Sequence, residues 1–80
     1  MTTQEVFEKL DKIFQDEFDD ESIHVTKETT ANDIEDWDSL AHINLISAIE
    51  TEFGMEFTMG EVTGMKNVGE MAEIIMSRVN

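Results

Sequence analysis

The sequence contains no cysteine and no proline, and it has only five basic residues against nineteen acidic ones. The absence of cysteine excludes disulfides and thiolate metal sites as sources of stability. No apolar run is long enough to span a bilayer, and the N-terminal segment MTTQEVFEKLDKIF carries acids where a signal or transit peptide carries bases. Eighty residues suffice for one small core and are too few for two. We therefore expect one soluble, cytoplasmic and monomeric domain over residues 1–80.

The formal net charge of -14 restricts the classes of partner. A field of this sign repels phosphate backbones and anionic lipids, so we expect neither nucleic acid nor a membrane surface as a partner. It steers the protein toward enzymes with basic patches, and it is equally compatible with an acidic surface that serves solubility alone. An apolar content of 40% with clear periodicity opposes disorder.

The first 38 residues predict one amphipathic helix followed by a long polar connection. The helix is expected from about residue 3 to about residue 18, with a capping box formed by Thr2 and Glu5. Its apolar face comprises Val6, Phe7, Leu10, Ile13, Phe14 and Phe18. A connection as long as residues 19–38 is unusual in a compact domain and indicates a function or a hidden short helical turn. We expect its isolated apolar residues to pin it to the core: Ile23, Val25, Ile34 and Trp37.

Three more helices are predicted in the rest of the chain. One begins after Asp38 and ends before Gly54, with an apolar face of Leu40, Ile43, Ile46, Ile49 and Phe53 that Leu45 widens. Thr58 and Glu61 predict a capping box on a short helix near residues 59–65, and Asn67 with Glu70 predicts a cap on the last helix. That helix carries Val68, Met71, Ile74, Ile75 and Val79. The expected fold class is all-α, a four-helix bundle with a short third helix and a long loop between the first two.

Ser39 stands at the junction between the long connection and the most apolar helical pattern. Asp38 is a good N-cap, because its carboxylate can accept the free backbone N–H groups of the first turn. Ser39 then occupies the first helical position and points outward at the positive end of the helix dipole. An exposed serine in this setting suits a phosphodiester.

Two catalytic or metal-binding interpretations are weaker. A Ser39–His42 dyad would also need an orienting group, an oxyanion hole and a pocket, for which an 80-residue bundle has little room. We expect His42 instead to pack beside Trp37 as a hydrophobic staple. The acid-rich stretches lack the central glycine and oxygen spacing of an EF-hand loop, so no dedicated metal site is predicted.

The string D-S-L at residues 38–40 opens an apolar helix that ends E-x-E-F-G, and this arrangement resembles the acyl carrier protein family. The resemblance covers essentially the whole chain in length, acidity and helix pattern. It implies that Ser39 carries 4′-phosphopantetheine, transferred from coenzyme A by a separate phosphopantetheinyl transferase. It also implies that the arm's thiol holds an acyl group as a thioester, and that the chain itself is not an enzyme. The further partners would be an acyl-loading ligase or acyltransferase and downstream synthase enzymes with basic patches.

The sequence departs from the family's fatty-acid-synthesis members along the helix that starts at Ser39. Those members bear several acids on this helix, whereas here Ala41 and Asn44 stand in such places and no acid occurs between Ser39 and Glu50. Our hypothesis is a specialised lipid or polyketide-type pathway with dedicated enzymes. The alternatives are an aminoacyl carrier, for example of D-alanine, and an acidic interaction module without a prosthetic group.

Methionines are abundant in the C-terminal half. They are Met55, Met59, Met65, Met71 and Met76. Methionine side chains adapt to irregular space. We favour core filling as their role, with shelter of a bound acyl chain as the alternative.

Overall fold

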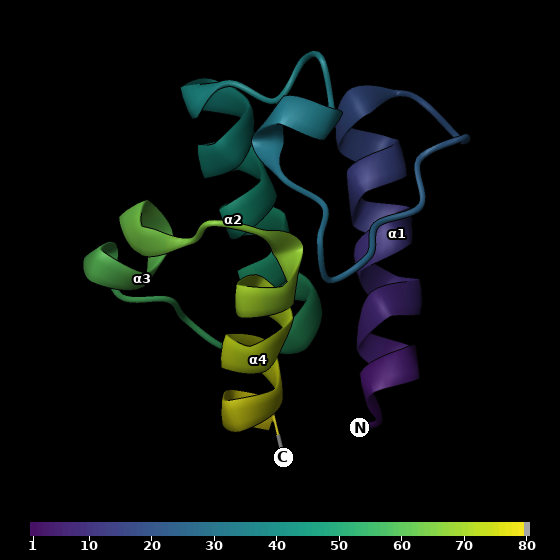
Figure 1. Cartoon of the computed structure of the whole chain (residues 1–80). Helices are drawn as coiled ribbons and strands as arrows, with labels where there is room; N and C mark the ends of the chain where they lie inside the picture. The colour runs from purple at the N-terminus through teal and green to yellow at the C-terminus, as the bar shows by residue number, and fades with distance from the viewer. Residues whose placement is uncertain (80) are drawn as a thin grey trace.

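The computed structural model describes residues 1–79, and this part of the chain is all-α (Figure 1). The elements are α1 (Thr3–Phe18), the 3₁₀ helix η1 (Ala31–Asp33), α2 (Ser39–Phe53), α3 (Met59–Gly64) and α4 (Val68–Val79). The predicted four-helix bundle with a short third helix and a long first loop is confirmed. Within residues 1–79, no helix combines the length and apolarity needed to cross a membrane.

The helix starts follow the predicted capping chemistry. Thr2 Oγ1 accepts the Glu5 N–H at 3.1 Å, and the Glu5 carboxylate accepts the Thr2 N–H at 2.9 Å. Thr58 and Glu61 form the same reciprocal pair at the start of α3. Such pairs satisfy backbone donors that have no partner inside the helix. At α4 the pattern is shifted by one residue: Asn67 caps the Glu70 N–H, but the Glu70 carboxylate accepts from Lys66 N–H.

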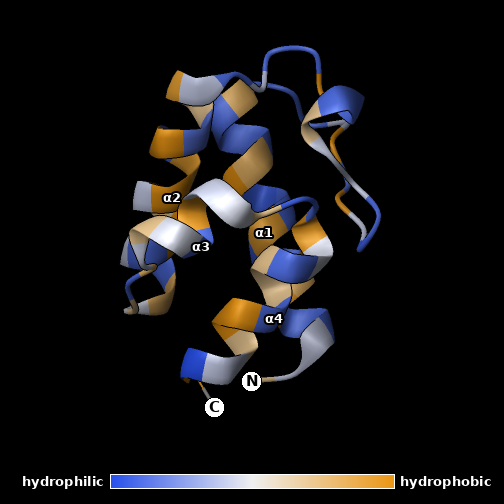
Figure 2. Cartoon of the chain, turned by 60° about the vertical axis from the view of Figure 1, so that its left-hand side comes forward, coloured by the Kyte–Doolittle hydropathy of each residue, from blue (hydrophilic) through white to orange (hydrophobic). Residues whose placement is uncertain are grey.

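The core lies where α1 packs against both α2 and α4. Its buried members come from all three helices and from the long connection. They are Val6, Leu10, Ile13, Phe14, Val25, Leu45, Ile46, Ile49, Val68, Met71, Ala72 and Ile75. Figure 2 shows the long connection as mostly hydrophilic with isolated hydrophobic positions, which agrees with the expected anchoring pattern.

One predicted helix face is wrong in part. Leu40 and Ile43 are 67% and 61% exposed, whereas Leu45, Ile46 and Ile49 are buried. The reason is geometric. Each residue turns an α-helix by about 100°, so each step of three falls about 60° short of a full turn. A run spaced only by threes therefore moves around the helix, and Leu40 ends about 180° from Ile49.

The long connection is tied to the bundle at its apolar anchors. Val25 is buried, while Ile23, Ile34 and Trp37 are half-buried against the core, as predicted. η1 is the short helical turn expected within this segment. The tie at Val25 is also polar, because Asp11 Oδ1 on α1 accepts the Val25 N–H at 2.6 Å.

The connection also reaches the start of α4. The N–H groups of Val68 and Gly69 donate to the carbonyl oxygens of Thr29 at 2.9 Å and Lys27 at 3.1 Å. Backbone donors of the first helical turn, which lack partners inside the helix, are thereby satisfied by a distant loop. This arrangement fixes the connection on one side of the bundle and leaves its end, at Asp38, beside α2.

Candidate functional site

Ser39 is an exposed residue at the first position of α2. Asp38 is extended and acts as the N-cap, with its Oδ1 accepting the Ala41 N–H at 2.8 Å. The predicted cap is thus confirmed, and its carboxylate is occupied within the first turn. Because the cap fixes where α2 begins, it also fixes the direction from which the Ser39 hydroxyl leaves the helix.

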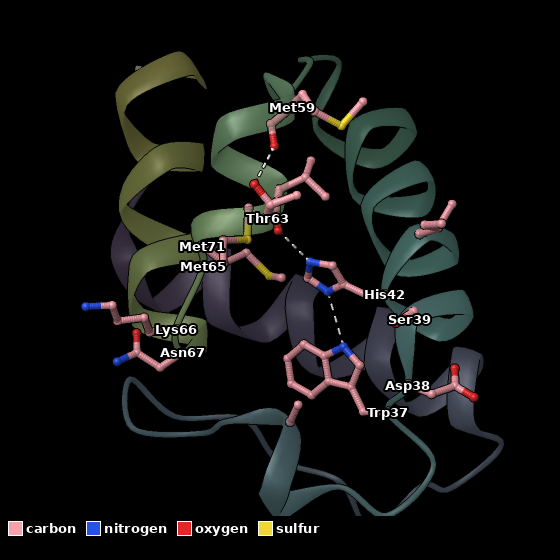
Figure 3. A pocket seen from close by; sticks show the side chains of 13 residues that line it. Trp37, Asp38, Ser39, His42, Met59, Thr63, Met65, Lys66, Asn67 and Met71 are labelled. Atoms are coloured by element: carbon pink, nitrogen blue, oxygen red, sulfur yellow. Dashed lines mark hydrogen bonds between the residues drawn. The ribbon is translucent and has the colours of Figure 1, made fainter.

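A cavity of about 610 Å³ opens beside Ser39. Its walls come from the end of the long connection, α2, α3, the link to α4 and α4 itself (Figure 3). Most lining side chains are apolar, and the charged ones are Asp38 and Lys66. The lining residues are Ala31, Trp37, Asp38, Ser39, His42, Ile43, Met59, Val62, Thr63, Met65, Lys66, Asn67 and Met71. A mixed apolar cleft of this size can accept a flexible hydrocarbon group.

His42 bridges two walls of this cavity. Its Nδ1 accepts the Trp37 indole N–H at 3.2 Å, and its Nε2 lies 3.0 Å from the carbonyl oxygen of Val62 (Figure 3). The predicted contact between His42 and Trp37 is present, with ring centroids 5.9 Å apart. Both ring nitrogens are engaged away from Ser39, so the residue pair does not form a nucleophile–base dyad.

Trp37 is held from its other side by aromatic residues of α1. Its ring meets Phe14 edge-on at a centroid distance of 5.1 Å, and Phe18 lies 6.5 Å away. Edge-to-face contacts of this kind are favoured by the charge distribution of aromatic rings. The indole is therefore a fixed wall of the cavity beside Ser39, joined to α1 by packing and to α2 by a hydrogen bond.

The methionines divide between the core and the cavity. Met55 and Met71 are buried, and Met65 and Met76 are half-buried against the core, so the core-filling interpretation holds for these four residues, although Met65 and Met71 also line the cavity. It is wrong for Met59, which is 79% exposed on α3 at the edge of the cavity. Leu40 and Ile43 on α2 and Met59 on α3 together form exposed apolar surface near Ser39.

An ion pair joins α3 to α4. Arg78 Nη2 donates to Glu61 Oε2 at 2.6 Å. This bond lowers the pKa of the Glu61 carboxyl and raises the pKa of the Arg78 guanidinium. From the sequence, Glu61 is expected only as a capping residue, and no pattern gives Arg78 a role. The cap uses only Oε1 of Glu61, which leaves Oε2 for a basic partner. Because the sequence has only five basic residues, Arg78 was one of few possible partners.

Comparison with known proteins places this geometry in a family context. The family described as "Phosphopantetheine attachment site" matches residues 8–75. An acyl carrier protein of Clostridium perfringens is 36% identical over 70 residues, covering 88% of this chain and 92% of that protein. One from Saccharopolyspora erythraea is 27% identical over 79 residues, covering 99% of this chain and 83% of that protein.

A solved structure has the same fold. The solution NMR structure of a holo acyl carrier protein from Geobacter metallireducens superposes with a TM-score of 0.87 at 43% sequence identity. The match covers 92% of this chain and 85% of the other.

Proposed function

Because this chain belongs to the acyl carrier protein family, a family of non-enzymatic carriers with a phosphopantetheine arm, we propose that Ser39 is the residue that bears the arm. The observation that carries this proposal is the position of Ser39, exposed at the first residue of α2 and beside the large apolar cavity. A phosphodiester at this position meets the positive end of the helix dipole. The arm's far end can reach either the cavity or a partner enzyme from here.

The residues around Ser39 fit a carrier that is modified by another protein. The Asp38 carboxylate is held by the Ala41 N–H, and His42 is held by Trp37 and Val62. His42 is held away from Ser39, and among the described residues no hydrogen bond joins the Ser39 hydroxyl to a base, so we expect the transferase to supply the base for the transfer. When bound, the arm supplies a thiol that holds an acyl group as a thioester.

The test is an intact mass measured after incubation with coenzyme A and a broad-specificity phosphopantetheinyl transferase. We expect a gain of one phosphopantetheine unit in the unaltered chain and none in Ser39→Ala. Ser47→Ala is the matched control, because Ser47 is an exposed serine on the same helix and should leave the gain intact. A gain of mass in Ser39→Ala would refute the assignment. So would the absence of any gain in the unaltered chain with several transferases. The latter result would favour an interaction module.

The proposed pathway is a specialised one with dedicated enzymes, rather than main fatty acid synthesis. Thirteen of the nineteen acids lie at or before Asp38, and none lies between Ser39 and Glu50. The exposed face of α2 near Ser39 therefore presents Leu40, Ile43 and Asn44 instead of carboxylates. A partner enzyme that binds this face through basic residues would find no carboxylates there to attract them.

Restoring carboxylates tests this proposal. We expect Ala41→Asp combined with Asn44→Glu to improve loading by a fatty-acid-synthesis acyltransferase, measured as kcat/KM for the carrier. Adding two acids elsewhere, at Ser77 and Gln4, controls for net charge. No gain from the α2 pair, or an equal gain from the control pair, would contradict the proposal.

We also propose that the cavity beside Ser39 shelters an acyl cargo. Trp37, Val62, Met65 and Met71 give it a mainly apolar wall. Amide shifts of the protein loaded with acyl groups of increasing length should then spread from Ser39 to Met65 and Met71. Changes confined to Ser39 at every length would exclude shelter. Mass analysis of the natively loaded protein would separate an acyl cargo from an aminoacyl one.

A further inference from the structure

The short helix α3 depends on few contacts for its position. None of its six residues is fully buried, and it lies at the side of the bundle beside α2 and α4 (Figure 1). Val62 and the following Met65 are half-buried against the core. Two polar contacts bind α3 to other helices: the Glu61–Arg78 pair to α4 and the His42–Val62 contact to α2. Since α3 also forms one wall of the cavity, these contacts help to hold that wall in place.

The partners of His42 determine its protonation state. The Trp37 indole N–H can only donate, so His42 Nδ1, at 3.2 Å, must offer a lone pair. The Val62 carbonyl oxygen can only accept, so His42 Nε2, at 3.0 Å, must carry the hydrogen. The contacts together require the neutral imidazole protonated at Nε2. A single ring thus links the aromatic residues of α1, through Trp37, to α3.

Protonation of His42 would break one of these two links. The imidazolium carries hydrogens on both nitrogens, so its Nδ1–H would face the Trp37 N–H, donor against donor. The link to Val62 keeps its donor and remains. Trp37 stays with Phe14 and Phe18, while His42 stays with α3. The cavity wall would therefore separate between Trp37 and His42.

Two charged residues line the cavity together with His42. Of the residues that share the cavity wall with it, Asp38 from the long connection and Lys66 before α4 are charged. The residues lining the cavity from α3 are Met59, Val62 and Thr63, and the one from α4 is Met71. From α1, Phe14 and Phe18 reach Trp37. The Asp38 carboxylate is committed to the Ala41 N–H, which leaves Trp37 and Val62 as the hydrogen-bond partners of the ring.

We propose that His42 is a positioning residue: its neutral form fastens α3 to the Trp37 wall and keeps the cavity beside Ser39 narrow, and its protonation releases that wall. The consequence for cargo rests on the proposed attachment at Ser39, because a chain on that arm would be held less well by a widened cavity. The change in the His42 contacts does not require the arm and is expected in the unmodified chain as well.

The unmodified protein offers a direct test. Trp37 is the sole tryptophan, so the indole N–H resonance and the indole emission both belong to this residue, and the indole N–H is the group that donates to His42. Between about pH 8 and about pH 5, we expect the Trp37 indole N–H and the amides of residues 59–64 to shift with one shared midpoint. A titration of the indole while the α3 amides stay fixed would overturn the proposal, because the link would then break without moving α3.

Variants separate positioning from simple proximity. In His42→Gln the side-chain amide can accept and donate but does not titrate, so the α3 amides should become independent of pH. His24→Gln is the matched control: His24 is the only other histidine of the sequence, is exposed, and contacts Asp11 on α1. It should leave the titration unchanged. A pH-dependent α3 in His42→Gln would refute the proposal.

A second variant guards against a folding failure of His42→Gln. Trp37→Phe keeps the aromatic packing against Phe14 but removes the donor. At neutral pH the chemical shifts of its α3 amides should resemble those of the unaltered protein at acidic pH. These shifts should no longer follow the pH-dependent change seen in the unaltered protein. Ser39→Ala should titrate like the unaltered chain, so failure of the switch and failure of the attachment site are distinguishable.

Discussion

The amide of Gly69 donates to the carbonyl oxygen of Lys27 at 3.1 Å, and a Cβ on Gly69 would lie 2.8 Å from the same oxygen. This close approach of the long connection to the first turn of α4 admits only glycine without movement. Gly60 is the second residue of α3, as Gly69 is of α4, and a Cβ there would meet nothing within 4 Å. The two positions form a matched pair with opposite expectations.

We expect Gly69→Ala to lower the free energy of unfolding by about 1–3 kcal/mol, the usual cost of overpacking. Gly60→Ala should raise it by up to about 1 kcal/mol, because alanine favours a helix over glycine. Urea denaturation of both variants provides the measurement. Equal effects of the same sign would show that the contact with Lys27 does not restrict residue 69.

Asp11 fastens the long connection to α1 at Val25. Its Oδ1 accepts the N–H of this buried residue at 2.6 Å. Asp11→Ala should cost about 1–3 kcal/mol, because it leaves a buried donor without a partner. Asp11→Asn retains an acceptor oxygen and should cost less. Asp16→Ala, a change at an exposed residue of the same helix, should alter the free energy of unfolding by no more than about 0.5 kcal/mol. Asp11→Ala with no effect would mean that water replaces the carboxylate.

The Glu61–Arg78 pair predicts one component of the pH dependence of stability. Its hydrogen bond lowers the pKa of Glu61 in the folded state. Unfolded chains therefore bind the proton more readily, and the stabilisation is complete above the unfolded pKa and lost as pH falls through the folded one. The melting temperature, measured from about pH 7 to about pH 3, should fall less steeply with decreasing pH for Glu61→Gln than for the unaltered protein. Glu73→Gln, an exposed change on α4, should keep the original slope. Parallel curves for all three proteins would contradict this assignment.

The exposed apolar residues of α2 should matter for partners and not for folding. Leu40→Ser and Ile43→Ser are expected to change stability by about 0.5 kcal/mol or less, because these side chains are already exposed. Ile49→Ala, on the buried face, should cost about 2–5 kcal/mol. Denaturation gives the stabilities, and transferase kinetics should show reduced kcat/KM for the two serine variants only. A large stability loss in either serine variant would indicate that the exposed face is covered in solution.

The elements of this fold were predictable because their signals are local. Capping residues such as Thr2 and Thr58, the N-cap Asp38 and the left-handed terminator Gly54 act within one turn, and each was found where the sequence placed it. The position of Ser39 followed from Asp38 alone. Its proposed role came from the D-S-L string in its context.

One error concerns the geometry of a single helix, and the omissions concern contacts between distant segments. Spacing by threes predicts one face for Leu40, Ile43 and Ile49, but an α-helix turns such a series around its axis and leaves Leu40 and Ile43 exposed. The acceptors for Val68 and Gly69 are carbonyl groups of Thr29 and Lys27, and every residue has such a group, so no side-chain pattern marks them. The contact of His42 with Val62 is equally invisible, since it also uses a backbone carbonyl.

The cap formed by Asp38 also bears on how a carrier finds its enzymes. It places Ser39 on the first turn of a fifteen-residue helix, so the anchor of a tether at this position is rigid. Conformational searching is then confined to the rotatable bonds of the tether. Once a partner has docked, the effective concentration of the tether's end at the active site depends on span and tether length. If a partner docks on the exposed face of α2, that face sets the span, and the distance from Ser39 to the partner's active site then limits turnover.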